Sequence, residues 1–350
     1  MATPRLSGFS MPPEWAPHER TWMEFPPANE TFGSDPEGDL LFYRRAWTAV
    51  TNTIAQYEPV SLICNLGDAD AAQALVGQNV SIYETPINDA WMRDSGPTFL
   101  THPDGRLGAT HWRFNAWGNG GFSKFDDEQH VGAFIAGLAG AELFSSAMVN
   151  EGGGIHVDGQ GTVMVTETVQ LDPARNPDWV AERADTELRS YLGIDQTIWV
   201  PRGLTRDYER FGTRGHIDMF AAFVRPGVVV AHVQNNPNHP DYEVSREYIA
   251  LLRKSRDAQG RPLEVIKIAA PTVTHIDDEI VDWSYINHYL CNGAVILCAF
   301  DDPHDEDAAR TLGHCYPDRD IVLVDARSIF DCGGGIHCIT QQQPAQVGTV

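Results

Sequence analysis

The chain has no long hydrophobic run and few basic residues. No stretch reaches the roughly 18 consecutive apolar residues that a membrane-spanning helix needs, and residues 1–6 contain no apolar core of a secretory signal. These absences predict a cytoplasmic protein without a membrane segment. Lysine and arginine total 25 against 48 aspartate and glutamate residues, a net charge of −23. This charge argues against nucleic-acid binding and would attract a small cationic substrate.

Cysteine motifs are also missing. The six cysteines form no Cys-x-x-Cys pair and no Cys/His spacing typical of a zinc site. Without a signal segment we expect a reducing compartment and no disulfides. Cys64, Cys291 and Cys298 lie in apolar runs and are predicted core residues. Cys338 differs, because it follows His337 at the end of a glycine-rich segment.

Short apolar runs separated by turn residues predict ten strands, and helical spacing predicts four helices. Asn176 is expected to cap the second helix, with Pro177 at its first position. The predicted strands cover residues 59–66, 80–86, 107–114, 161–166, 196–201, 219–224, 227–233, 263–269, 293–300 and 320–325. The predicted helices cover residues 126–138, 177–192, 242–256 and 305–312.

The order of these elements distinguishes two α/β architectures. Strict alternation of strands and helices would predict a parallel doubly wound sheet. Strand pairs intervene here, as at 219–224 and 227–233, so a hairpin-plus-helix unit repeats along the chain. This pattern favours a propeller-like ring. No linker or low-complexity stretch divides the 350 residues, so we expect one domain covering residues 1–350.

One sequence of five residues, Gly-Gly-Gly-Ile-His, occurs twice, at 152–156 and 333–337. Glycine lets the backbone adopt positive φ and approach a ligand closely. The repetition suggests similar structural units that meet at a site, and the alternative is two unrelated glycine turns. Glu151 precedes the first copy and Cys338 follows the second, and both residue types serve catalysis.

Two loops contain aromatic and acidic candidates for a binding site. Residues 88–97 include Asp89, Trp91 and Asp94, where a ring could stack on a cation and a carboxylate could pair with it. Residues 112–121 are rich in aromatics and glycine, and Trp117 could form part of a pocket wall. The alternative for the first loop is an ordinary surface turn.

A third segment, residues 215–220, contains His216 and Asp218. The two residues lie at the expected start of a strand, so their side chains should project from the same face. Together with Cys338 they could provide a nucleophile, a base and a carboxylate. Surplus acids suit a cationic reacting group, since guanidinium N–H pairs match carboxylates bidentately. A cysteine protease is disfavoured, because none of its local signatures occurs.

Together these segments resemble the agmatine deiminase and bacterial-type peptidylarginine deiminase family of the guanidine-modifying pentein superfamily. The resemblance extends from residues 11–18, Met-Pro-Pro-Glu-Trp-Ala-Pro-His, to residues 337–344, His-Cys-Ile-Thr-Gln-Gln-Gln-Pro. It implies a five-bladed pseudo-symmetric α/β propeller of ββαβ-type units with the site at its centre. It also implies hydrolysis of a C–N bond in a linear amidine, most simply agmatine to N-carbamoylputrescine and ammonia.

The resemblance also implies roles for individual residues. Cys338 matches the nucleophile that forms an amidino-thioether, and His216 matches the general acid and base. Asp94 and Asp218 match the carboxylates that clamp the guanidinium, and Glu151 matches the acid that supports the histidine. Further substrate contacts are expected from Trp91, Asp89, Trp117 and Arg214. No metal or organic cofactor is expected.

The sequence departs from the agmatine-specific pattern near the expected mouth of the site. Gly154 and Gly335 stand where relatives often have Ser or Asn, and Met219 replaces a frequent Asn. Residues 211–214, Phe-Gly-Thr-Arg, replace an Asp-Thr-Asn type run. Another substrate therefore stays open, such as a guanidino acid, an arginine derivative or peptidyl-arginine. Arg113 or Arg214 could then pair with a substrate carboxylate.

Two other functional classes stay open beside hydrolysis. An amidinotransferase shares this chemistry but passes the amidino group to an amine, and a cation-binding protein could retain the fold without catalysis. A homodimer is possible by analogy with relatives. His337 is expected to point away from Cys338 in an extended segment and to be structural, as is His156. Asp158 is expected to be a turn residue.

Overall fold

Five mixed sheets with one recurring strand pattern dominate the structure. This computed structural model describes residues 2–119, 124–209, 211–276 and 279–346. Each sheet has one antiparallel pair of strands followed by a parallel pair, and at least one helix connects the parallel strands. The mixed α/β sheets expected from the sequence are thereby confirmed.

The first sheet combines strands from opposite ends of the described chain, in the order β18-β1-β2-β3. Strand β1 pairs antiparallel with β18 and parallel with β2, and β3 extends the sheet in parallel. The elements of this unit are β1 (His18–Glu24), α1 (Asp39–Ile54), β2 (Val60–Cys64), α2 (Ala69–Gln73), β3 (Val80–Glu84) and β18 (Thr340–Pro344).

Each of the other four mixed sheets consists of three strands that follow one another directly in the sequence. The second unit contains β4 (Thr98–Thr101), β5 (Leu107–Arg113), α5 (Glu128–Ala139) and β6 (Glu142–Val149). The third contains β7 (His156–Val157), β8 (Thr162–Thr166), α6 (Glu167–Gln170), α7 (Ala181–Leu192) and β9 (Gln196–Val200). The fourth contains β10 (Ala221–Arg225), β11 (Val228–Val233), α8 (Asp241–Lys254) and β12 (Glu264–Ala269). The fifth contains β15 (Tyr289–Cys291), β16 (Ala294–Ala299), α9 (Asp305–Cys315) and β17 (Asp320–Asp325).

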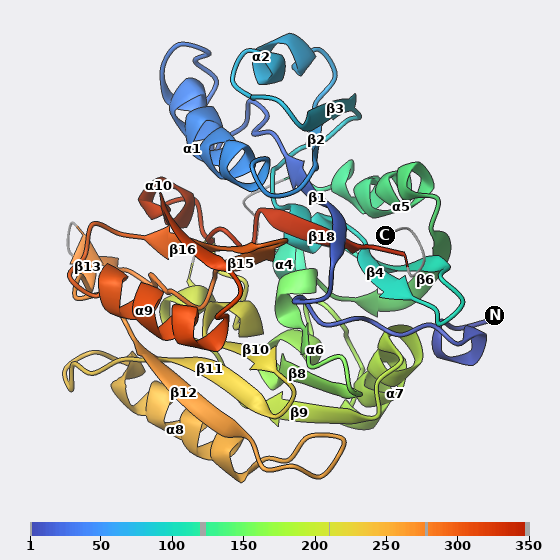
Figure 1. Cartoon of the computed structure of the whole chain (residues 1–350), viewed down its shortest axis with the longest axis vertical. Helices are drawn as coiled ribbons and strands as arrows, with labels where there is room; N and C mark the ends of the chain where they lie inside the picture. The colour runs from blue at the N-terminus through green and yellow to red at the C-terminus, as the bar shows by residue number, and fades with distance from the viewer. Residues whose placement is uncertain (1, 120–123, 210, 277–278, 347–350) are drawn as a thin grey trace.

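Short elements connect the sheets. They are η1 (Arg5–Ser7), α3 (Met92–Ser95), α4 (Ala116–Asn119), η2 (Gly152–Gly154), η3 (Arg206–Tyr208), η4 (Ile217–Met219), the hairpin of β13 (His275–Ile276) with β14 (Glu279–Ile280), and α10 (Arg327–Phe330). Figure 1 shows α1, α5, α7, α8 and α9 spaced around the periphery, with α4 and α6 nearer the centre.

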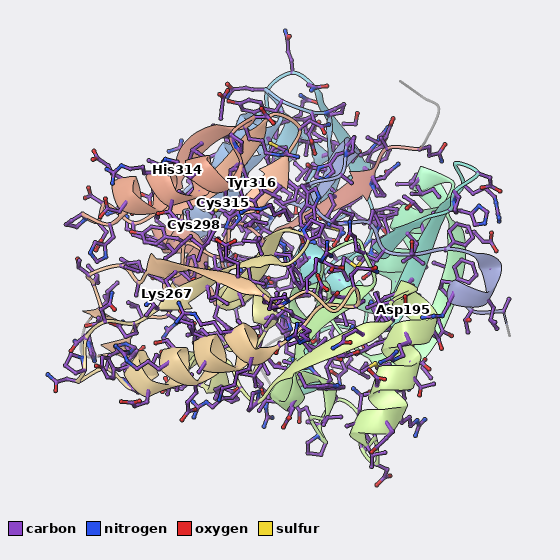
Figure 2. All side chains as sticks on the ribbon, turned by 60° about the horizontal axis from the view of Figure 1, so that its bottom comes forward. Asp195, Lys267, Cys298, His314, Cys315 and Tyr316 are labelled. Atoms are coloured by element: carbon purple, nitrogen blue, oxygen red, sulfur yellow. The ribbon has the colours of Figure 1, made fainter. Side chains whose placement is uncertain are left out.

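Side chains fill the space between the sheets and the helices (Figure 2). Strand β11 is buried along its whole length, as expected for a strand covered on both faces. Helix α5 buries Val131 and Ile135, which lie one turn apart on its inner face. All six cysteines are buried and free, which agrees with the predicted core cysteines. No helix in the described part of the chain could cross a membrane.

Two predicted local structures are wrong. Helix α7 starts at Ala181 rather than Pro177, because Asn176 does not cap it; the Asn176 side chain instead bonds the backbone N and O of Val149, at 3.0 and 2.9 Å. The strand predicted from Met219 begins at Ala221, because the 3-10 turn η4 comes first.

Candidate active site

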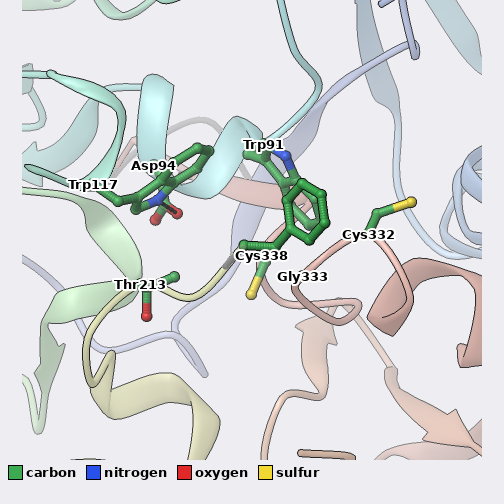
Figure 3. A pocket seen from close by; sticks show the side chains of 8 residues that line it. Trp91, Asp94, Trp117, Thr213, Cys332, Gly333 and Cys338 are labelled. Carbon is green, nitrogen blue, oxygen red and sulfur yellow. Dashed lines mark hydrogen bonds between the residues drawn. The ribbon is translucent and has the colours of Figure 1, made fainter. Parts of the chain in front are cut away.

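A small pocket lies beside the turn that connects α10 to β18. Figure 3 shows the side chains of Trp91, Asp94, Trp117 and Cys338 gathered around it. Segments far apart in the sequence therefore meet here. The described lining residues are Trp91, Asp94, Trp117, Phe211, Thr213, Cys332, Gly333 and Cys338.

The Cys338 thiol has two polar neighbours. Its Sγ lies 3.2 Å from Nδ2 of Asn287 and 3.7 Å from Oδ2 of Asp218. The orientation of the Asn287 amide follows from its other contacts, because Oδ1 accepts a 3.0 Å bond from the backbone N–H of His337. Burial, and then the charges of Asp218 and Asp94, raise the pKa of the thiol well above its ordinary value. Cys338 at rest is therefore a thiol that needs a nearby positive charge or donor to ionise.

His216 is completely buried between two carboxylates. Its Nε2 lies 3.1 Å from Oε2 of Glu151, and its Nδ1 lies 3.8 Å from Oδ2 of Asp94. Burial alone would lower the pKa of His216, but Asp94 and Glu151 outweigh it and raise the pKa to about 9. The imidazole is therefore protonated at neutral pH, as a general acid requires.

Glu151 is fixed by a buried arginine. Both of its oxygens accept 3.0 Å hydrogen bonds from Nε of Arg175, whose other nitrogens donate to Asp172 and to the carbonyl of Thr213. Burial would raise the pKa of Glu151, but Arg175 and His216 together lower it. The carboxylate therefore stays ionised and holds His216 in place.

Asp94, in α3, points both carboxylate oxygens at donors. Oδ2 accepts a 2.8 Å hydrogen bond from Nε1 of Trp117, and Oδ1 accepts a 3.0 Å bond from the backbone N–H of Gly153. Burial raises the pKa of Asp94 to about 6, with His216 opposing and the other carboxylates adding to the effect. Asp94 is thus charged at neutral pH and loses that charge under mildly acidic conditions.

Gly153 lies directly against three of these groups. A Cβ at this position would come within 2.5 Å of Nδ1 of His216, 3.0 Å of Oδ2 of Asp218 and 3.0 Å of Oδ1 of Asp94. The first glycine triplet is therefore required for close approach. In the second triplet, Gly333 has a φ of 113°, a backbone conformation that favours glycine.

Asp218, in η4, is held by His337, the residue before Cys338. Nδ1 of His337 lies 2.8 Å from Oδ2 of Asp218, while Oδ1 is buried and hydrogen-bonded to none of the described residues. Burial would raise the pKa of Asp218, but the hydrogen bond and charge of His337 lower it. The prediction that His337 points away from the site is wrong, because residues 336–339 form a turn and not an extended segment.

The arrangement places a protonated imidazole and ionisable acids next to a thiol that lines the cavity. A cation bound among the carboxylates would offset their charges and lower the pKa of the thiol. No cluster of three or more His, Cys, Asp or Glu among the described residues is arranged to hold a metal ion. The group therefore provides nucleophilic and acid–base chemistry on a positively charged substrate.

The structure brings together seven of the residues that the sequence singles out. They are Cys338, His216, Glu151, Asp94, Asp218, Trp91 and Trp117. Asp89 is buried outside the described cavity lining and accepts a hydrogen bond from Trp91. The half-exposed Arg214 side chain also lies outside this lining, 3.4 Å from Oδ2 of Asp172, and Arg113 is exposed. Gly120 and Gly121 of the aromatic loop lie outside the described residues.

Sequence reasoning missed three residues that support the site: Asn287, Arg175 and Glu14. Asn287 has no local signal, since its partner Cys338 lies 51 positions away. Arg175 lies in a loop without a recognisable motif, and what marks it as important is the complete burial of its side chain against Glu151, which only the structure shows. Glu14 belongs to the resembling N-terminal segment, but nothing in that segment indicates contact with His337.

The fold consists of repeated mixed α/β units, and the site combines a thiol with acids that suit a positively charged group. These two features together indicate the class of enzymes that modify guanidinium groups. The profile of the Porphyromonas-type peptidyl-arginine deiminase family matches residues 10–344. The chain belongs to this family.

Relatives along the whole length agree with this assignment. A Streptomyces avermitilis protein, whose agmatine deiminase name is provisional, is 53% identical over 98% of this chain and 99% of its own. The agmatine deiminase of Ectopseudomonas mendocina is 38% identical over 99% and 98%. The solved agmatine deiminase of Enterococcus faecalis superposes with a TM-score of 0.93 at 30% identity, covering 99% of both chains.

Proposed function

We propose that this chain is a deiminase that hydrolyses agmatine to N-carbamoylputrescine and ammonia. The observation that carries the proposal is the composition of the cavity. Cys338 and Asp94 lie among Trp91, Trp117 and Phe211, and no described lining residue is lysine or arginine. The names of the relatives support the same substrate.

The proposed chemistry has two steps. Docking of the guanidinium lets Cys338 release its proton to solvent, and the thiolate sulfur attacks the guanidinium carbon. The bond to one terminal nitrogen breaks, and ammonia leaves with a proton from His216, which yields an amidino-thioether. Water then gives a proton to His216 and attacks the same carbon. The carbon–sulfur bond breaks, the hydroxyl proton of the adduct passes to the sulfur, and the neutral ureido product leaves with His216 protonated again.

The carboxylates are assigned to binding and orientation. Asp94 and the free Oδ1 of Asp218 would each accept N–H groups of the guanidinium. Glu151 would keep His216 oriented, since it lies 3.1 Å from its Nε2. Positioning of both reactants supplies much of the rate enhancement in such reactions.

The distribution of charge supports an amine tail over a carboxylate tail. The arginine predicted to bind a substrate carboxylate, Arg214, lies beside Asp172. The aromatic rings of Trp91 and Trp117 suit an alkyl chain that ends in a cation. A guanidino acid would bury its carboxylate without a described cationic partner, which is costly.

We further propose that the five sheets close around one axis as the blades of a propeller and form one domain. The shared strand pattern and the pairing of β1 with β18 support this arrangement. Homodimer formation and cytoplasmic location stay predictions.

The test is a product assay with purified protein. Ammonia and N-carbamoylputrescine are measured from agmatine, with arginine, an arginyl peptide and guanidino acids in parallel. We expect turnover of agmatine that Cys338→Ala abolishes and that Cys315→Ala, a buried thiol of α9, retains. Turnover of another guanidine but not of agmatine would show that the enzyme has a different substrate. A strict need for an amine acceptor would indicate amidino transfer. No reaction in a folded protein would overturn the proposal.

A further inference from the structure

The two copies of Gly-Gly-Gly-Ile-His meet at one carboxylate. Nε2 of His337, from the second copy, lies 2.8 Å from Oε1 of Glu14, and Nε2 of His156, from the first, lies 3.6 Å from Oε2. The two imidazole rings stack, with centroids 6.4 Å apart and planes inclined by 24°. The repeated motif therefore places two histidines on Glu14 as well as glycines at the site.

A continuous chain of polar contacts leads from Glu14 to the site. His337 bridges the two acids, because Nδ1 contacts Asp218 at 2.8 Å while Nε2 contacts Glu14 at the same distance. Oδ2 of Asp218 then lies 3.7 Å from Sγ of Cys338. Glu14 is thus two side chains away from the thiol and touches neither it nor the cavity described above.

The side chains that make up this series of polar contacts are buried. Glu14, His337 and Asp218 are each at most 5% exposed, and they line a second, small pocket together with His156, Ala222, Ile286, His288 and Tyr316. At so buried a position a charge is retained only with a partner of opposite sign. Alternating charges on Asp218, His337 and Glu14 satisfy this condition.

We propose that Glu14, acting through His337, is a positioning residue that keeps Asp218 ionised and its Oδ1 available to the guanidinium. Glu14 provides the negative charge that holds a proton on His337. The protonated His337 fixes Oδ2 of Asp218 by a charge-assisted hydrogen bond. The three groups together retain one net negative charge, which attracts the cationic substrate; the inference thus rests on the proposed function.

Several charged groups act on this balance, and His156, which stacks on His337, lowers the pKa of Glu14 as His337 does. Glu14 and Asp218 favour its protonated form, whereas burial and the guanidinium of Arg93 disfavour it. The Arg93 guanidinium lies 3.5 Å from Oε1 of Glu14. Burial is the main cause that lowers the pKa of His288, on the cavity wall, to about 4, and this histidine stays neutral.

Asp218 also faces His216, whose charge favours its ionised form, and the thiol of Cys338. The net direction for His337 is a raised pKa, and for Glu14 a lowered one. Both directions agree with the alternating charges that the distances indicate.

The experiment compares Glu14→Gln with the wild type and with Glu58→Gln. The amide keeps an acceptor for Nε2 of His337 and removes only the charge. Glu58 is a matched control, because it is another buried acid beside a histidine, with Oε1 3.2 Å from Nδ1 of His18. Nε2 of the same His18 lies 2.9 Å from the backbone carbonyl of Glu14, so this control perturbs the same segment and leaves the Glu14 carboxylate in place. Both variants are first checked for folding by circular dichroism and thermal unfolding.

The first readout needs no turnover. The ring nitrogens of His337 are titrated by NMR with ¹⁵N-histidine labelling, assigned by loss of the signal in His337→Asn. We expect wild-type His337 to stay protonated well above the ordinary histidine pKa of about 6.5, and Glu14→Gln to lower this pKa by about one unit or more. Glu58→Gln should leave it unchanged.

The second readout is the pH profile of agmatine turnover. In Glu14→Gln we expect kcat/KM to fall about tenfold, the rate equivalent of one pKa unit, with most of the change in KM and with a further acid limb from Asp218, whose pKa rises when the charge of Glu14 is lost. A Glu14→Gln enzyme that is less stable but keeps the wild-type profile would overturn the inference. If that variant does not fold, a wild-type His337 pKa at or below the ordinary value overturns it equally. Failure of wild-type turnover would instead remove the proposed function, while the titration still tests the charge chain.

Discussion

The indole Nε1–H of Trp117 donates a 2.8 Å hydrogen bond to Oδ2 of Asp94. This bond joins the aromatic wall of the cavity to the carboxylate that is buried beside the thiol. It also uses one of the two Asp94 oxygens, so it fixes which lone pairs stay available to a guanidinium. The orientation of Asp94 therefore depends on a residue 23 positions away.

Replacing this donor should weaken catalysis without disturbing the core. In Trp117→Phe the ring is retained and the hydrogen bond to a charged acceptor, worth about 1.5–3 kcal/mol, is lost. We expect kcat/KM for agmatine to fall about tenfold to a hundredfold. Trp112→Phe is the matched control, since its indole donates a 2.9 Å bond to Thr98 remote from the cavity. Equal effects of the two changes would contradict a specific role.

A methyl group at Gly153 should lower the rate about a hundredfold. Its position lies 2.5 Å from His216 and 3.0 Å from both Asp94 and Asp218, so all three must move. A displacement of this size costs about a hundredfold in rate. Gly154→Ala serves as the comparison, because its nearest neighbour is a methyl group of Val169 at 3.1 Å. Steady-state kinetics of both folded variants test the prediction, and a Gly153→Ala enzyme as active as the wild type would refute it.

The acid limb of the pH profile should reflect Asp94. Burial raises its pKa to about 6, so the group is charged above that pH and neutral below it. We expect kcat/KM to decline as the pH falls through about 6, because a neutral carboxyl binds a guanidinium poorly. Thermal unfolding at each pH separates this loss from denaturation, and Asp94→Asn should lack the limb. A flat wild-type profile between pH 7 and 5 would contradict the assignment.

Loss of Arg175 should unfold the region around the histidine. Arg175→Met would leave Glu151 and Asp172 as buried acids without their shared partner. Breaking a buried ion pair from one side costs about 3–5 kcal/mol, which denaturant titration measures. Arg183→Met, an exposed arginine that rests on Trp179 at 4.0 Å, should cost about 1 kcal/mol or less. Similar losses for both would show that the buried network is not the cause.

The sequence predicted much of the site, because its residues lie in compact motifs. Cys338, Glu151 and the pair His216 and Asp218 each lie within a few residues of a glycine segment or turn. Asp158, expected in a turn, does hold one, since its Oδ1 accepts bonds from the backbone N–H groups of Gln160 and Thr162. Local chemistry of this kind is readable without a structure.

What stayed hidden depends on long-range packing. If residues 336–339 were extended, the side chain of His337 would point away from that of Cys338. These residues form a turn instead, and both side chains lie near Asp218. Asn287 reaches the thiol from another sheet unit, and no local pattern reports that distance.

Secondary structure was missed where local preference and burial disagree. Helix α1 contains Thr48, Val50, Thr51, Thr53 and Ile54, which are β-branched and weak helix formers. Its formation follows instead from the buried stripe that includes Trp47, Thr51 and Ile54. Strands β1 and β18 carry Glu, Arg and Gln side chains that do not resemble a buried strand, although much of both is buried.

The pairing of β1 with β18 has a consequence for synthesis on the ribosome. The thiol lies two residues before β18, and that strand completes the sheet begun by β1. A nascent chain that has not yet emerged past residue 344 keeps an open edge on β1 and cannot place Cys338 against Asp218. Cys338 therefore reaches its place in the site only after β18 has been made and has paired with β1, and chains that stop before β18 leave β1 without this partner.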